Sequence, residues 1–308
     1  MGAMSTTTAA ESQALASLPA SRAPVAAGLA CYLMWGLLPI LFIWGGRLGA
    51  GAFEIVAWRT IWSVPCAVAL VVATGQVQAL SRLPARTLAL LLLSAVLIAV
   101  NWSTYVWAVS TGRTISASLG YYLSPLLNMA AGAWMFKERI GRAGLVAIAL
   151  ASIGVVFQGL ALGEFPWVSL MLALSFGGYG VVRKTVAVEA QTGLLVECLI
   201  LVFPAAAYAI WLAHSGHGVF GASPAATLAL ALGGPATVIP LALFAFAARR
   251  MPLTAIGFLQ FITPTLQFMV GVEAGESLTP LRAFSFIFIW GGVLVFAAKV
   301  WLGRRRKA

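Results

Sequence analysis

Ten runs of about 20 apolar residues constrain the fold of this chain most strongly. A helix of about 20 residues, at 1.5 Å per residue, crosses the roughly 30 Å hydrocarbon layer of a membrane. Such runs are about twice as long as a barrel strand requires, and helices satisfy their backbone hydrogen bonds internally. The sequence therefore predicts an all-α integral membrane protein with ten transmembrane helices. The predicted spans are residues 25–44, 53–73, 88–107, 115–136, 145–162, 167–182, 194–213, 225–247, 253–272 and 283–302.

The composition leaves no room for a large soluble domain beside these spans. Of the 308 residues, 61% are hydrophobic and 9% are charged, whereas soluble domains average about 25% charged. The net charge of +11 would suggest nucleic acid in a soluble protein. In a membrane protein the topology accounts for it, so no nucleic-acid partner is predicted.

The distribution of basic residues predicts the orientation. With the N-terminus in the cytoplasm, 15 of the 19 Lys and Arg residues lie in cytoplasmic segments and three outside, the last being Arg59 within a span. This bias places both termini in the cytoplasm, for which we expect a bacterial inner membrane. Residues 1–24 are expected to form a disordered tail, and residues 303–308 a basic tail beside anionic lipid.

A weak internal repeat divides the chain into two halves. A shift of 139 residues aligns Pro125 with Pro264 and Pro65 with Pro204, and a polar amide follows Pro125 and Pro264 three residues later in each half. Five spans in each half would insert the second copy upside down. We therefore predict two inverted five-helix repeats, residues 25–162 and 163–302, which are characteristic of secondary transporters.

Polar and aromatic residues inside the spans are the candidate substrate contacts, because polar groups in a membrane are costly. Asn101 and Tyr105 lie one helical turn apart, and other candidates precede prolines that free a backbone carbonyl. Pro125 and Pro264 are candidate hinges for opposite gates. The predicted cavity residues are Asn101, Trp102, Tyr105, Tyr121, Tyr122, Tyr179, Gln260 and Phe261.

Other intramembrane side chains have structural interpretations. Seven further tryptophans suit the membrane interface, and three amides suit contacts between helices. The tryptophans are Trp44, Trp58, Trp107, Trp134, Trp167, Trp211 and Trp301, and the amides are Asn128, Gln158 and Gln267.

The charged residues bear on the driving force. Glu54, Glu197 and Glu273 are predicted near span ends, and Arg59 is predicted to extend its guanidinium outward to the interface. Proton coupling usually requires a titratable group at the centre of the pathway. We therefore expect transport down the substrate's own gradient, with Glu197 as the one candidate for coupling.

A membrane-embedded enzyme is an alternative class. The chain has no Asp, and its two histidines, His214 and His217, lie in one Gly-rich loop. Such a pair is a weak metal signal, and no Walker A sequence is present. We expect no catalytic residue, metal or cofactor; a passive channel or a lipid flippase stays open.

Over Val25–Lys299 the sequence resembles the EamA-type drug/metabolite transporter superfamily and its RarD-like branch. The motifs are Ser116–Tyr122, Ser175–Lys184, Ala187–Gly193 and Gly257–Phe261. The resemblance implies ten spans in two inverted repeats and export of small metabolites. The chain is also similar to YddG-type exporters of aromatic and other neutral amino acids. It departs from the branch at Trp58, where a histidine often precedes the arginine.

These observations predict an exporter of amino acids that works by alternating access. Its aromatic side chains would pack an apolar substrate group or meet an ammonium, while Asn101 and Gln260 would bind the carboxylate or ammonium. Its partners are a small-molecule substrate and the lipid bilayer, and no obligate protein partner is inferred. Export of amphiphilic drugs is the alternative.

Overall fold

The structure is a computed structural model that describes residues 23–81, 83–135, 142–162, 165–248, 250 and 259–305. These described residues form helices and loops, with no strand. The helices are α2 (Ala23–Arg47), α3 (Ala52–Ala73), α4 (Val77–Leu80), α5 (Ala85–Ser110), α6 (Thr114–Met135), α7 (Arg142–Leu162), α8 (Trp167–Thr185), α9 (Ala190–Ser215), α10 (Pro224–Ala231), α11 (Pro235–Ala248), α13 (Ile262–Glu273) and α14 (Pro280–Arg305).

The helices have the length and surface of membrane spans. Within the described residues, five segments are long and apolar enough to cross a membrane: α2, α3, α5, α9 and residues 224–244. Large apolar side chains such as Phe203 and Leu294 point outward, at 74% and 67% exposure. Only lipid makes such a surface favourable, so the protein is an all-α, multi-pass membrane protein.

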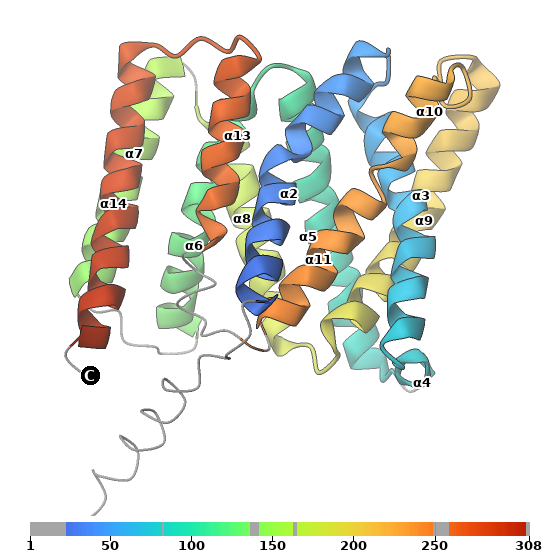
Figure 1. The fold of residues 1–308 in the computed structure, drawn as a ribbon, viewed down its shortest axis with the longest axis horizontal. Coiled ribbons are helices and arrows are strands. Elements are labelled where there is room, and N and C mark those ends of the chain that lie inside the picture. Colours follow the sequence, from blue (N-terminus) through green and yellow to red (C-terminus); the bar gives the residue numbers. More distant parts are fainter. Residues whose placement is uncertain are drawn as a thin grey trace, which may run out of the picture.

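The helices pack in a layered bundle (Figure 1). Helices α7 and α14 lie side by side at one edge, and α3 and α9 at the other. Between these pairs, α2 packs against α11 and α13, while α8 packs against α5 and α6. The start of α2 and the end of α14 lie at the same end of the bundle.

The span predicted at residues 225–247 is interrupted in the structure. Helix α10 ends at Ala231 and α11 begins at Pro235, with two glycines between them. A Cβ at Gly234 would lie 2.3 Å from the backbone carbonyl carbon of Trp62, so only glycine permits this approach of α3. Proline at the first position of α11 then favours a new helix start.

Two other predicted segments differ or are only partly described. The span predicted at 253–272 is represented by α13, and residues 251–258 lie outside the described residues. The predicted basic tail begins at residue 303, but α14 continues through Arg305. The predicted N-terminal tail lies outside the described residues except for Ala23 and Pro24, which begin α2.

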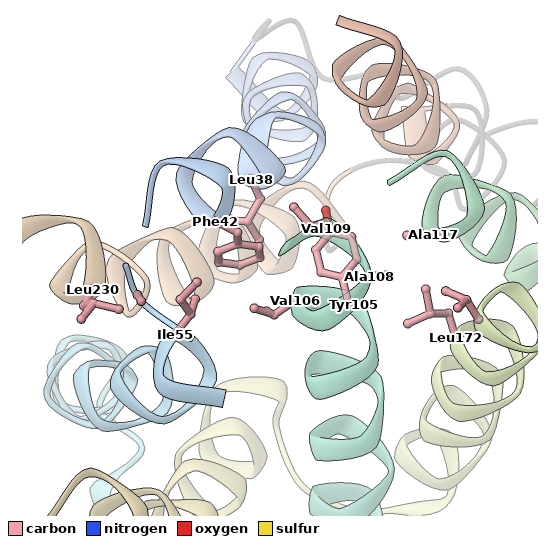
Figure 2. Close-up of a cluster of buried hydrophobic side chains, with 12 residues drawn as sticks. Leu38, Phe42, Ile55, Tyr105, Val106, Ala108, Val109, Ala117, Leu172 and Leu230 are labelled. Atoms are coloured by element: carbon pink, nitrogen blue, oxygen red, sulfur yellow. The ribbon is translucent and has the colours of Figure 1, made fainter. Parts of the chain in front are cut away.

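The largest buried apolar cluster lies between α2, α3, α5, α6, α8 and α10 (Figure 2). Phe42 of α2 and Tyr105 of α5 meet edge to face within it, with ring centroids 5.9 Å apart. Of the candidate cavity residues, Tyr105 lies in this cluster and Tyr121 packs against it.

Candidate functional site

Arg59 lies inside the bundle, so the prediction that it reaches the interface is wrong. Its side chain is 4% exposed, and Nε donates a 2.7 Å hydrogen bond to Oγ1 of Thr237 in α11. The guanidinium carbon lies 4.3 Å from the centre of the Trp102 ring. Arg59 shares a helix face with Ile55 and Ser63, which are also buried. The side chain therefore points into the bundle and not toward the membrane interface.

The break between α10 and α11 makes room for Arg59. A Cβ at Gly233 would lie 3.0 Å from the Cβ of Arg59, so the backbone of the break lies directly against α3. Thr237 follows one turn later and meets the guanidinium. Its hydroxyl in turn donates to the carbonyl of Gly233, 2.7 Å away. The Gly-Gly-Pro sequence therefore positions the partner of Arg59.

Asn101 of α5 links three helices. Its Nδ2 donates to the carbonyl of Leu172 and to Oγ of Ser175, both in α8 and both 3.1 Å away. The hydroxyl of Tyr121, in α6, donates to Asn101 Oδ1 at 3.0 Å. The Asn101 side chain is 1% exposed. The structure therefore brings Asn101 and Tyr121 together, as neighbours in one buried network.

Aromatic rings continue from this network through the bundle. Tyr105 meets Tyr121 edge to face at 5.3 Å between ring centroids, and Tyr121 meets Phe176 at 5.9 Å. Phe176 stacks on Tyr179 at 6.1 Å within α8. Edge-to-face and offset contacts of this kind are the favoured arrangements of aromatic pairs. We call Tyr105, Tyr121, Phe176 and Tyr179 the aromatic line.

Glu197 lies at the far end of the aromatic line. Its carboxylate accepts hydrogen bonds from the hydroxyls of Ser94, at 2.5 Å, and Tyr179, at 3.2 Å. Arg183 Nη1 lies 3.6 Å from Glu197 Oε1. Glu197 is the eighth residue of α9 and is 2% exposed. Sequence reasoning selected Glu197 but missed the contacts with Ser94 and Arg183, which come from different helices.

Tyr122 and Phe261 belong to a separate cluster. The hydroxyl of Tyr122 shares a 2.6 Å hydrogen bond with Thr265 and accepts a 2.8 Å bond from Trp290 Nε1. Phe261 stacks on the Tyr122 ring at 6.4 Å. Consecutive helical residues point about 100° apart, so Tyr122 faces α13 and α14 while Tyr121 faces Asn101. The structure therefore divides the predicted cavity residues into two groups.

Of the remaining predicted residues, Gln260 and Pro264 lie around the start of α13, and Pro125 lies in α6. Gln260 is half-buried and directly precedes Phe261, the residue before α13. Pro264 is the third residue of α13, where its missing N–H leaves no helical hydrogen bond unmade. Pro125 lies in the middle of the helical segment α6. The two prolines thus occupy different positions in their helices.

Sequence reasoning assigned Gln267 to contacts between helices, and the structure gives it such a partner. Its Nε2 lies 3.4 Å from the carbonyl of Trp35 in α2, and Thr263 donates to the carbonyl of Tyr32. Pro39 has no N–H for the Trp35 carbonyl, four residues earlier. The side-chain amide of Gln267 therefore supplies a donor to the Trp35 carbonyl, which Pro39 leaves without its helical partner.

A cavity of about 290 Å³ lies between α3, α5 and α9. Trp102 forms part of its wall. The polar groups around it come from Thr60, Ser103, Tyr208 and Trp102. The cavity therefore combines an apolar wall with a few hydroxyl groups, as small-molecule sites do.

The described residues show no arrangement suited to metal binding. No group of three or more His, Cys, Asp or Glu side chains lies together within them. His214 is near the end of α9 and His217 follows in the adjoining loop. Among the described residues, the candidate site therefore consists of hydrogen-bonding groups, aromatic rings and the buried charged side chains of Arg59 and Glu197.

Comparison with known proteins identifies transporters as relatives. The model of the EamA-like transporter family matches residues 22–159. An uncharacterized transporter of Pseudomonas aeruginosa is 40% identical over 285 residues, covering 91% of this chain and 94% of the relative. Protein RarD of Escherichia coli is 37% identical over 290 residues, covering 93% and 97%.

A solved structure has a similar fold. This crystal structure of a protein with 20% identity superposes with a TM-score of 0.62, covering 92% of this chain and 99% of the other. The similarity at this identity concerns the fold alone. Together with the close relatives over nearly the whole length, the family match shows that this chain belongs to the EamA/drug-metabolite transporter superfamily and is a RarD-like protein.

Proposed function

We propose that this protein exports aromatic and other neutral amino acids across the bacterial inner membrane by alternating access. The aromatic line carries the proposal, because it joins polar groups at Asn101 and Glu197 through a row of rings inside the bundle. Amides and hydroxyls can bind the charged groups of an amino acid, and the rings can pack its side chain. Few fixed charges would make the site permissive toward different side chains.

The packing of the helices supports two inverted repeats. We pair each helix of the first repeat with one of the second, in chain order: α2 with α8, α3 with α9, α5 with α11, α6 with α13 and α7 with α14. When the members of each pair are exchanged, the contact between α2 and α11 becomes the contact between α8 and α5, which the structure also has. The exchange likewise maps α2–α13 onto α8–α6, and keeps the α3–α9 and α7–α14 pairs unchanged. Such symmetry would let the same contacts open first on one side of the membrane and then on the other. In this proposal both termini are cytoplasmic, and Pro125 and Pro264 serve as hinges for the opposite gates.

Two glycines at the contact between α7 and α14 also support the inverted repeat. A Cβ at Gly154 of α7 would lie 2.9 Å from the carbonyl oxygen of Ser285 in α14. A Cβ at Gly292 of α14 would lie 2.9 Å from the carbonyl oxygen of Ala147 in α7. Each helix thus supplies one glycine to the other, as two copies of an ancestral helix would.

Amphiphile export is a second candidate, favoured by the cavity between α3, α5 and α9. Its wall is mainly apolar, so it can hold the hydrocarbon part of an amphiphile. A preference for amphiphiles over amino acids in the efflux assay would favour this function.

The proposal is tested by efflux from proteoliposomes loaded with labelled amino acids or amphiphilic drugs, without an ion gradient. We expect several amino acids to leave downhill and to compete with one another. Trp102→Ala should slow this efflux at equal protein content, because Trp102 is 8% exposed, lines the cavity and lies about one helical turn before Tyr105 of the aromatic line. Trp211→Ala is the matched control, since Trp211 is 57% exposed on α9. Equal rates in the two variants would count against this site.

A further inference from the structure

Arg59 is a buried cation without an acidic partner among the described residues. Its Nη1 atom is buried and has no hydrogen-bond partner there, and no carboxylate of these residues forms an ion pair with it. Glu54, on the same helix, instead accepts hydrogen bonds from the backbone amides of Val219 and Phe220. Glu197 is held by Ser94, Tyr179 and Arg183. Taking a charge out of water without a counter-charge is costly, so such a group indicates a functional role.

The groups around Arg59 are neutral and come from several helices. Thr237 of α11 accepts the hydrogen bond from Nε. The guanidinium carbon lies 5.5 Å from the ring centre of Phe42 in α2 and 4.3 Å from that of Trp102 in α5. These contacts orient the guanidinium and attract it through the rings, but they supply no negative charge. The site is therefore complete except for an anion.

Space for a ligand lies one side chain away from Arg59, because Trp102 lines the cavity and Arg59 does not. Ala57 and Thr60, which lie near Arg59 in the sequence, line the 290 Å³ cavity together with Trp102. The guanidinium of Arg59 contacts the ring of Trp102. The cavity therefore extends to the side chain that supports Arg59.

We propose that Arg59 binds the carboxylate of the transported substrate. An arginine fork can donate two parallel hydrogen bonds to a carboxylate, and Nη1 is the donor left without a protein partner. Thr237 holds the fork through Nε, and Trp102 supports its face. This inference rests on the proposed function and refines it, because the sequence alone assigned the carboxylate to Asn101 or Gln260. Asn101 is already occupied by Leu172, Ser175 and Tyr121.

Three probes separate the carboxylate from the rest of an amino acid: L-phenylalanine, 3-phenylpropanoate and 2-phenylethylamine. Binding is measured from the concentration-dependent rise in the thermal unfolding midpoint of the purified full chain. We expect both carboxylates to stabilise the wild-type protein. Arg59→Gln should weaken both by roughly ten- to one-hundredfold, the usual range for hydrogen bonds to a charged group, and should leave any binding of the amine unchanged.

Two variants separate binding from folding. Arg59→Lys keeps the charge but not the fork, so its carboxylate affinity should be intermediate. Arg59→Met removes an unpaired buried charge, so it should raise the unfolding midpoint while abolishing the response to carboxylates. Arg47→Gln is the matched control, because Arg47 is exposed at the end of α2. A purely structural Arg59 would instead give a lower midpoint in Arg59→Met.

The outcomes also separate this inference from the proposed function. Unchanged carboxylate affinity in Arg59→Gln, or wild-type protein that binds only the amine or none of the probes, would overturn the inference. If 3-phenylpropanoate binds through Arg59 but proteoliposomes release no amino acid, the anion site is supported and amino-acid export is contradicted. If L-phenylalanine efflux is the same in wild type and Arg59→Gln, the inference fails and the proposed function stands.

Discussion

Replacing Asn101 by alanine should destabilise the bundle measurably without preventing its insertion into the membrane. The substitution removes two hydrogen bonds to α8 and one accepted from Tyr121 of α6. The residue lies within an apolar span and away from the basic loops, so the orientation signal is unchanged. The loss therefore falls on helix–helix packing.

The magnitude follows from the three contacts. Hydrogen bonds between membrane helices contribute about 0.6 kcal/mol on average and at most about 1.7 kcal/mol. Losing all three should cost Asn101→Ala about 2 kcal/mol in the free energy of unfolding. Tyr121→Phe removes one of them and should cost about 0.6 kcal/mol. Because both changes remove the same bond, the double variant should lose less than the two single losses added together.

Reversible unfolding in mixed micelles of a mild detergent and sodium dodecyl sulfate would measure these free energies. Ser103→Ala is the matched control, since Ser103 lies on the same helix and faces the cavity; we expect it to stay within about 0.5 kcal/mol of wild type. Asn101 would not be the link between α5, α6 and α8 if Asn101→Ala lowered the free energy of unfolding by less than about 0.5 kcal/mol. The same conclusion would follow if the double variant with Tyr121→Phe lost the full sum of the two single losses.

Two further predictions follow from packing and charge. Gly120→Ala would place a Cβ 2.7 Å from the carbonyl oxygen of Ser169, so we expect it to lower the unfolding free energy by about 1–3 kcal/mol. Gly46→Ala, with no atom within 4 Å of the new Cβ, is its control; equal values would contradict the close α6–α8 contact. Glu197→Gln should retain downhill substrate efflux, because we propose transport driven by the substrate gradient. An imposed pH gradient that drives uphill accumulation only in the wild type would show that Glu197 couples transport to protons.

Much of the fold could be predicted because membrane helices are specified locally. Runs of apolar residues, interrupted by glycine, proline and charged loops, predicted helices at positions where the structure has α2, α3, α5 and α9. The interruption at Gly233 and Gly234 was missed, although the residues that cause it are visible in the sequence. Its cause is the close approach of Trp62 from another helix, which no local pattern reports.

The candidate site was predictable in residue type more than in arrangement. A polar cluster around Asn101 stands out in an apolar span, and Tyr121 does lie beside it. The separation of Tyr122 and Phe261 from that group depends on which face of α6 meets α13. Periodicity could not reveal this, because several faces of a membrane helix are apolar.

The sequence by itself determined that this protein is helical and embedded in a membrane, since the length and polarity of a segment decide whether it can remain in lipid. Only the tertiary structure decided where its charges lie. Arg59 is close enough to a span end to reach water, yet it faces Trp102 and Thr237 inside the bundle. Glu197 meets Ser94 and Arg183 from two other helices. Rotation and packing of the helices are collective properties, and they convert the same residues from membrane anchors into an internal site.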